Sequence, residues 1–185
     1  MLLIKNAYFT DQEIKKINES SSYQCKIYTN KYFSYAYQEE SINEKALIIN
    51  GSFIYLDGFF FNKINEHHDS SEKLIKKLFE KYRNKELDQY LASLDGFFSI
   101  VIYDNLSNEI SLYSDHIGSK ELFFVQNNYF YVCTELEEIK LITNNFLLDK
   151  SVVIDYFKFF NRSSGKTFYK NILSTESCEK ITFRK

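Results

Sequence analysis

Four β-forming runs follow one another between residues 94 and 133, and they constrain the possible fold more than any other feature of the sequence. Apolar and aromatic residues alternate or cluster within each run, and polar residues at 104–108 and 126–128 supply turns between them. This pattern predicts an antiparallel meander with one buried face. A helix is expected to follow it from Glu135 to Thr143.

Shorter strand-like and helix-like segments fill the rest of the chain. Strands are predicted at Met1–Phe9, Tyr23–Thr29, Tyr32–Tyr37, Lys45–Ile49, Thr167–Leu173 and Lys180–Phe183. Helices are predicted at Thr10–Glu19, Ser71–Tyr82, Lys85–Ser93 and Ser151–Asn161. Thr10 and Glu13 have the spacing of a capping box at the start of the first helix. The aromatic segment Phe53–Phe61 is not assigned to either class.

The composition excludes several classes of protein. With 185 residues, 44% of them hydrophobic, the chain can form one domain with a substantial core, so disorder is not expected. The net charge is −2, whereas a nucleic-acid-binding domain usually has a basic face, so we expect no nucleic-acid partner. We predict a cytoplasmic protein without membrane contact, because no apolar run could span a bilayer and the first residues lack a signal-peptide pattern. Cys25, Cys133 and Cys178 lack metal-ligand or disulfide spacing and are expected to be incidental or buried thiols.

Four motifs of the β-rich region occur in an order that is typical of one family of domains. They are the strand start Leu94–Phe98, the turn Asp115–Gly118, the strand Leu122–Phe124 and the helix opening Cys133–Glu135. Together they resemble the class II glutamine amidotransferases, as in the N-terminal glutaminase half of asparagine synthetases. The resemblance extends from about Ala46 to the end of the chain and includes Leu47–Tyr55 and Phe168–Ile172. Before Ala46 it is thin.

The resemblance implies both a fold class and a mechanism. The family's domain is α+β, a four-layer αββα sandwich of two antiparallel sheets, as in the N-terminal-nucleophile hydrolases. We therefore expect a single glutamine amidotransferase-like domain over residues 1–185. The family's nucleophile is an N-terminal Cys whose own α-amine can serve as the base. The corresponding position here is Leu2, which closes the acyl-enzyme route, and no catalytic residue is assigned.

The substrate pocket that the resemblance implies is retained only in part. Asn50 and Gly51 match the Asn-Gly pair of the family's oxyanion hole, and Ser52 replaces the Glu that follows it. Asp95, followed by Gly96, matches the Asp that holds the glutamine α-amine, although a plain turn residue is the preferred interpretation of Asp95. No Arg occupies the strand on which the family clamps the α-carboxylate. The sequence thus predicts a vestigial pocket at these five residues and a domain without glutaminase activity.

No metal and no cofactor are expected. His67, His68 and Asp69 could ligate a metal, but adjacent side chains point apart and no third ligand group is near in the sequence. A solvated loop is the preferred interpretation of these three residues. His116 belongs to the turn that, in the resembled family, has a structural role.

Three functional interpretations stay open. The preferred one is a catalytically inactive domain that acts as the binding or structural half of an ATP-dependent amide-forming system, in natural-product or peptide biosynthesis. Its partner would be a synthetase or cyclase that carries the ATP-pyrophosphatase domain, or a second copy of the chain. The second interpretation is the excised N-terminal domain of a longer asparagine synthetase-like enzyme. The third is an active amidohydrolase with a displaced nucleophile, Cys133 or Ser52.

Overall fold

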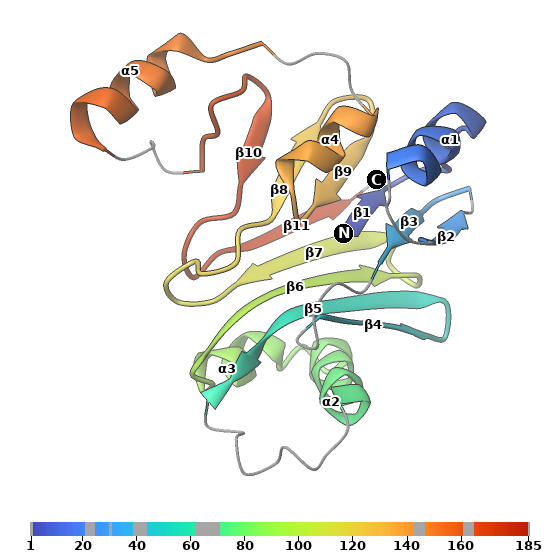
Figure 1. Cartoon of the computed structure of the whole chain (residues 1–185). Helices are drawn as coiled ribbons and strands as arrows, with labels where there is room; N and C mark the ends of the chain where they lie inside the picture. The colour runs from blue at the N-terminus through green and yellow to red at the C-terminus, as the bar shows by residue number, and fades with distance from the viewer. Residues whose placement is uncertain are drawn as a thin grey trace. The chain divides into compact units, whose positions relative to one another are not determined.

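Two antiparallel sheets with helices packed against them make up the computed structural model of this chain (Figure 1). The structure describes residues 2–20, 25–29, 31–38, 44–61, 71–142, 147–160 and 165–184. The chain forms two compact units, which we name the six-stranded and the five-stranded unit after their sheets. The former comprises Met1–Gln38 and Glu121–Glu176, the latter Glu39–Lys120 and Ser177–Lys185. The predicted α+β class with two antiparallel sheets is confirmed and is consistent with a sandwich of the N-terminal-nucleophile hydrolase type.

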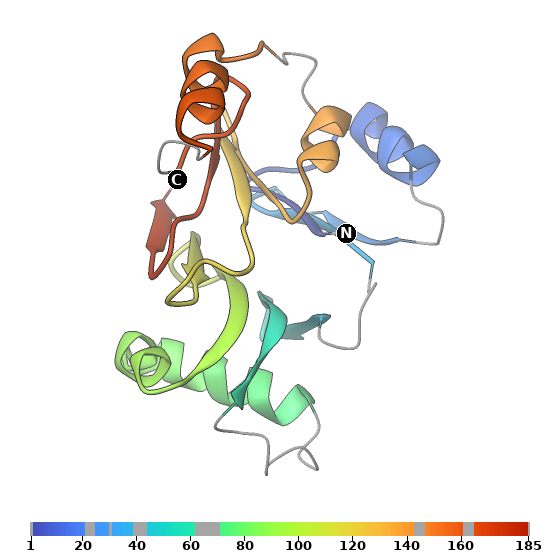
Figure 2. The ribbon, with the colours of Figure 1, turned by 60° about the vertical axis from the view of Figure 1, so that its left-hand side comes forward.

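The six-stranded unit contains a sheet of order β10-β8-β9-β1-β3-β2. Its strands are β1 (Leu2–Lys5), β2 (Lys26–Thr29), β3 (Ser34–Tyr37), β8 (Phe123–Gln126), β9 (Phe130–Cys133) and β10 (Ile172–Ser174). Its helices are α1 (Asp11–Ser20), α4 (Leu136–Ile142) and α5 (Lys150–Phe159). Helices α1 and α4 lie side by side in both views (Figures 1 and 2) and contribute Ile17 and Ile139 to the core of this unit.

The capping box predicted for α1 is confirmed. The backbone N–H of Thr10 donates to Glu13 Oε2 at 2.7 Å, and the N–H of Glu13 donates back to Thr10 Oγ1 at 3.3 Å. The same Glu13 carboxylate accepts from Lys5 Nζ at 2.9 Å, and only 4% of the Lys5 side chain is exposed. One carboxylate therefore both caps the helix and neutralises a buried lysine of β1.

The five-stranded unit contains a sheet of order β11-β7-β6-β5-β4. Its strands are β4 (Glu44–Ile49), β5 (Ser52–Phe60), β6 (Gly96–Asp104), β7 (Glu109–Ser114) and β11 (Lys180–Arg184). Helices α2 (Ser71–Arg83) and α3 (Leu87–Ala92) lie together against this sheet (Figure 1). Ile75, Leu78 and Phe79 of α2 pack in one core with Ile54 and Leu56 of β5 and with residues of β6. No described helix of either unit is long and apolar enough to cross a membrane.

Strand β5 occupies the segment that the sequence left unassigned. Both of its faces are buried along most of its length, so the period-two alternation that marks a half-buried strand is missing. At Gly58 the backbone has φ +122°, and a Cβ there would lie 1.9 Å from the carbonyl oxygen of Phe97 on the neighbouring strand. Only glycine fits this close approach of β5 and β6.

The predicted four-stranded meander with one buried face is wrong. Strands β6 and β7 pair with each other in the five-stranded sheet, whereas β8 and β9 pair in the other sheet. Strands β6 and β7 are also buried on both faces. Strands β6 and β7 form one hairpin and β8 and β9 another, but the polar segment between Ser114 and Phe123 is a change of sheet and not a third hairpin.

Asp115 organises this change of sheet. Its carboxylate accepts hydrogen bonds from the backbone N–H groups of Phe98 at 3.0 Å, Ile117 at 2.8 Å and Ser119 at 3.1 Å. Burial alone would raise the pKa of Asp115, but these hydrogen bonds and one from the Ser119 hydroxyl hold it below its ordinary value. Gly118 has φ +66° in the same turn. Asp115 therefore anchors the turn as an ionised acceptor, the structural role that the resemblance implied for this region.

Candidate functional site

Leu2 is enclosed in the six-stranded sheet. It belongs to β1, which pairs with β3 on one side and β9 on the other. The Leu2 N–H donates to Thr134 Oγ1 at 3.2 Å, and the N–H of Thr134 donates to the Leu2 carbonyl at 3.3 Å. The Leu2 side chain is 0% exposed. At the position where the resembled family has its nucleophile, this chain therefore has an aliphatic core residue whose backbone is held in place by the sheet and by Thr134.

Glu138 lies close to this position and was not singled out in the sequence. Its Oε2 accepts from the backbone N–H of Thr134 at 3.1 Å and from that of Glu135 at 3.2 Å. The side chain is buried, and burial raises the pKa of Glu138 to about 7. The sequence does contain a signal that could have identified Glu138. It is an acidic residue in the first turn of a predicted helix, shortly after the pair Thr134-Glu135. The carboxyl group anchors the start of α4 and titrates near neutrality.

Asn50 and Gly51 form the turn of the β4–β5 hairpin. Both residues have positive φ, 50° and 77°, as a two-residue hairpin turn requires, and both are exposed. Ser52, the first residue of β5, is fully buried. Its hydroxyl oxygen accepts from Arg83 Nη2 at 2.9 Å and from the Asn105 N–H at 3.1 Å. These three residues thus make local structural contacts at one tip of the five-stranded sheet.

Asp95 and Gly96 lie at the other end of the same pair of strands. Gly96 pairs with Phe60, and the Asp95 carbonyl accepts from the Phe61 N–H at 2.7 Å. Phe60 lies eight positions after Ser52 along β5, which corresponds to roughly 27 Å of extended strand. The structure therefore does not bring the five predicted pocket residues together.

A different Asx-Gly pair lies close to Gly96. Asp57 and Gly58 pair with Ser99 and Phe98 of β6, two to three positions along the strand from Gly96. The carboxylate of Asp57 is largely buried and lies 3.3 Å from Lys120 Nζ. The hydroxyl of Ser99, opposite Asp57, is buried and has no hydrogen-bond partner among the residues that the structure describes. Sequence reasoning missed this pair because the aromatic run around it had no assigned structure.

The candidate displaced nucleophiles are both buried. Burial raises the pKa of the Cys133 thiol well above its ordinary value, which disfavours the reactive thiolate. The Ser52 hydroxyl faces a guanidinium group, which cannot act as a base. Strand β3 contains no Arg.

His116 is exposed, and His67, His68 and Asp69 lie outside the described residues. Within the described ranges no three His, Cys, Asp or Glu residues are grouped so that they could hold a metal ion.

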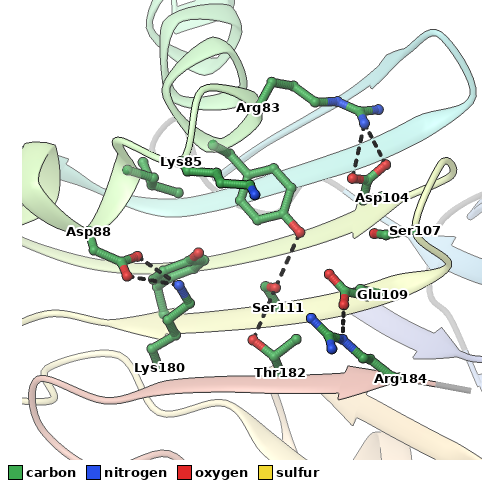
Figure 3. A pocket seen from close by; sticks show the side chains of 13 residues that line it. Arg83, Lys85, Asp88, Asp104, Ser107, Glu109, Ser111, Lys180, Thr182 and Arg184 are labelled. Atoms are coloured by element: carbon green, nitrogen blue, oxygen red, sulfur yellow. Dashed lines mark hydrogen bonds and ion pairs between the residues drawn. The ribbon is translucent and has the colours of Figure 1, made fainter.

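A polar hollow of about 510 Å³ opens on the five-stranded unit (Figure 3). It is lined by the end of α2, the start of α3, the end of β6 with the turn after it, and strands β7 and β11. The lining residues are Tyr82, Arg83, Lys85, Leu87, Asp88, Asp104, Ser107, Glu109, Ser111, Tyr113, Lys180, Thr182 and Arg184. Three ion pairs cross it: Arg83–Asp104, Lys180–Asp88 and Arg184–Glu109. The hydroxyl oxygen of Ser111 lies 3.4 Å from that of Tyr82 on one side and 3.4 Å from that of Thr182 on the other.

The strand residues of this hollow could have been found from the sequence. Polar side chains recur at every second position of β7 and β11, so they share one face of each strand. What the sequence could not show is that these two strands are neighbours, because residues 115–179 separate them. Since six of its seven charged side chains, all but Lys85, pair with one another, the hollow by itself indicates no ligand.

The comparison with protein families identifies the family of this chain. The glutamine amidotransferase domain matches residues 57–185, more than two thirds of the chain. The matched region begins at Asp57, so it includes Asp95, Gly96 and Asp115 and leaves out Asn50, Gly51 and Ser52. A search of the curated proteins found no match.

Proposed function

This chain belongs to the glutamine amidotransferase domain family, and we propose that it acts by binding and does not hydrolyse glutamine. The observation that carries this proposal is Leu2. A class II amidotransferase needs a thiol there, next to an α-amine that can accept the thiol's proton. An aliphatic side chain that is wholly enclosed in the sheet supplies neither a nucleophile nor access to a substrate.

A second departure concerns the oxyanion hole. Because Asp57-Gly58 lies close to Gly96 in the paired strands β5 and β6, whereas Asn50-Gly51 lies at the far end of β5, we align the family's Asn-Gly pair with Asp57-Gly58 and no longer with Asn50-Gly51. An Asn amide donates a hydrogen bond to a developing oxyanion, whereas an ionised Asp can only accept. The carboxylate of Asp57 lies 3.3 Å from Lys120 Nζ, and a carboxylate at this position opposes negative charge in the substrate. Even with a nucleophile restored, the site would therefore stabilise the transition state poorly.

The role that fits these losses is the binding or structural half of an ATP-dependent amide-forming system. Its partner would be a synthetase or cyclase that carries an ATP-pyrophosphatase domain and forms the amide bond. If the native chain continues past Lys185 into such a domain, the same role would be exercised within one chain. This proposal rests on the family resemblance and on the missing chemistry, and natural-product or peptide biosynthesis is the setting that we favour.

The loss of activity is tested by measuring glutamate release from glutamine with the purified chain and with an active class II amidotransferase as the positive control. We expect no release above the rate without protein. The Leu2→Cys variant should stay inactive as well, because the oxyanion hole and the carboxylate clamp are also altered. Release that disappears in the Cys133→Ser or Ser52→Ala variant would overturn the proposal and establish a displaced nucleophile.

The partner is tested in the native host. A tagged chain is purified, its stable partners are identified by mass spectrometry, and the ATP-dependent amide formation of a recovered synthetase is measured with and without the chain, with ammonium as the nitrogen source. We expect amide formation to require the chain although no glutamine is present. A recovered synthetase that works equally well alone would contradict a binding or structural role.

A further inference from the structure

One charged side chain of the polar hollow on the five-stranded unit is left out of its ion pairs. The hollow, of about 510 Å³, is lined by four cationic and three anionic side chains, and the three ion pairs described above join six of them. The remaining one is Lys85, whose ammonium group has no ion-pair or hydrogen-bond partner among the described residues. Figure 3 shows its side chain over the hollow, between the Arg83–Asp104 and Lys180–Asp88 pairs. The lining therefore carries one net positive charge.

The backbone of Lys85 has a conformation that glycine adopts more easily. Lys85 has φ +60° and lies two residues after the end of α2. Its N–H donates to the Tyr82 carbonyl at 3.0 Å, and the Glu86 N–H donates to the Lys81 carbonyl at 2.9 Å, which are the two hydrogen bonds of a Schellman motif. Glycine is the usual residue at this left-handed position, because any side chain is strained there. A lysine in its place indicates a role for the side chain beyond ending the helix.

The hydroxyl groups that line the hollow can form further hydrogen bonds. Ser111 Oγ lies 3.4 Å from the hydroxyl oxygens of both Tyr82 and Thr182, whereas O–H···O hydrogen bonds are usually about 2.7–2.8 Å long. The three hydroxyls have three O–H donors, and the two contacts between them use at most two. At least one donor is therefore available to a molecule in the hollow, and the long contacts are weak enough to be exchanged for shorter ones.

The size and the chemistry of the hollow together define the kind of molecule that fits it. Small-molecule sites have volumes of roughly 300–1,000 Å³, and the volume of this hollow falls within that range. A lysine ammonium group binds phosphate or carboxylate oxygens as a point charge, and neutral hydroxyls donate to the same kinds of atom. Each carboxylate of the hollow is paired with its own cation, which reduces its repulsion of a bound anion. A small anion with further polar groups therefore matches the lining.

We propose that the hollow binds a small organic anion, whose phosphate or carboxylate group pairs with Lys85 and whose other polar groups hydrogen-bond to the hydroxyls of Tyr82, Ser111 and Thr182. The proposal does not rest on the proposed loss of glutaminase activity. An active and an inactive domain would bind the anion equally, because the lining of the hollow includes neither Leu2 nor the Asp57-Gly58 pair.

NMR chemical-shift titration of the full chain in low-salt buffer, with inorganic phosphate and separately with acetate, measures this binding. We expect one saturable site with a dissociation constant of roughly 1 mM for the preferred anion, and that preference tells a phosphate ester from a carboxylic acid as the natural ligand. Lys85→Gln should weaken the binding about tenfold and Ser111→Ala about fivefold, because each removes one donor to the anion or its polar groups.

The matched control is Lys16→Gln, which removes the same charge from the exposed side of α1 in the other unit and should bind like the wild type. If neither anion binds with saturation, the proposal is wrong. Equal weakening in Lys85→Gln and Lys16→Gln would also overturn it, because the anion would then respond only to the net charge of the protein.

The Lys85→Gly variant separates a binding role of Lys85 from a structural one. It removes the ammonium group and relieves the strain at φ +60°, so it should lose affinity for the anion as Lys85→Gln does, while its melting temperature rises by roughly 2–4 °C. Lys85→Gln keeps the strain and should melt near the wild-type temperature. A Lys85→Gly variant that melts below the wild type would overturn the argument, because the lysine would then serve the fold. Wild-type affinity for the anion in this variant would overturn it as well.

Discussion

A single buried carboxyl group makes the stability of this protein depend on pH near neutrality. Burial raises the pKa of Glu138 from its ordinary value of 4.5 to about 7, so between these two values the folded chain holds a proton that the unfolded chain releases. Stability contributed by the protonated group is present at acidic pH and is lost as the pH rises through 7. The loss amounts to roughly 3 kcal/mol when it is complete.

Replacement of Glu138 by Gln should remove this dependence. The amide oxygen can still accept from the N–H groups of Thr134 and Glu135, but no proton is lost on raising the pH. We expect the free energy of unfolding of Glu138→Gln, relative to the wild type, to increase between pH 4.5 and 8. Urea unfolding at several pH values measures it, and Glu137→Gln, on the exposed side of the same helical turn, is the control. Wild-type and Glu138→Gln profiles that run parallel would contradict the assignment.

At the scale of the element, β5 depends on the close contact of its backbone with β6. Gly58→Ala would place a methyl group 1.9 Å from the Phe97 carbonyl oxygen at a φ of +122°, and neither backbone can move without breaking the ladder. We expect a loss of roughly 2–4 kcal/mol in the free energy of unfolding. Gly51→Ala is the matched control, because its φ is also positive but its new methyl group meets only the flexible Asn105 side chain at 3.0 Å.

The control substitution should cost about 1 kcal/mol, the usual penalty for a left-handed residue with a side chain. Urea denaturation of both variants by circular dichroism compares them directly. Equal losses for the two glycines would show that the β5–β6 contact is less tight than the structure places it.

Local sequence signals determined most elements of this protein. The Thr10–Glu13 capping box, the Asn50-Gly51 turn and the period-two strands β7 and β11 depend on interactions within a few residues, so they could be predicted from the chain alone. The motifs from Leu94 onward indicated the family in the same way, and the family match over residues 57–185 agrees with them. The identity of Leu2 likewise needed no structure.

Only the tertiary structure decided how these elements are combined. The sequence pattern from Leu94 to Cys133 predicts one meander, but the chain changes sheet at the turn that Asp115 anchors. Local periodicity could not predict this, because strands pair with partners that are distant in the sequence. The strand register then separated Asn50 from Asp95 by the length of β5 and placed Asp57 near Gly96. Exposure is decided in the same way. The apolar residues of α5 resemble those of a core helix in the sequence, and only packing shows that their partners are missing from the described chain.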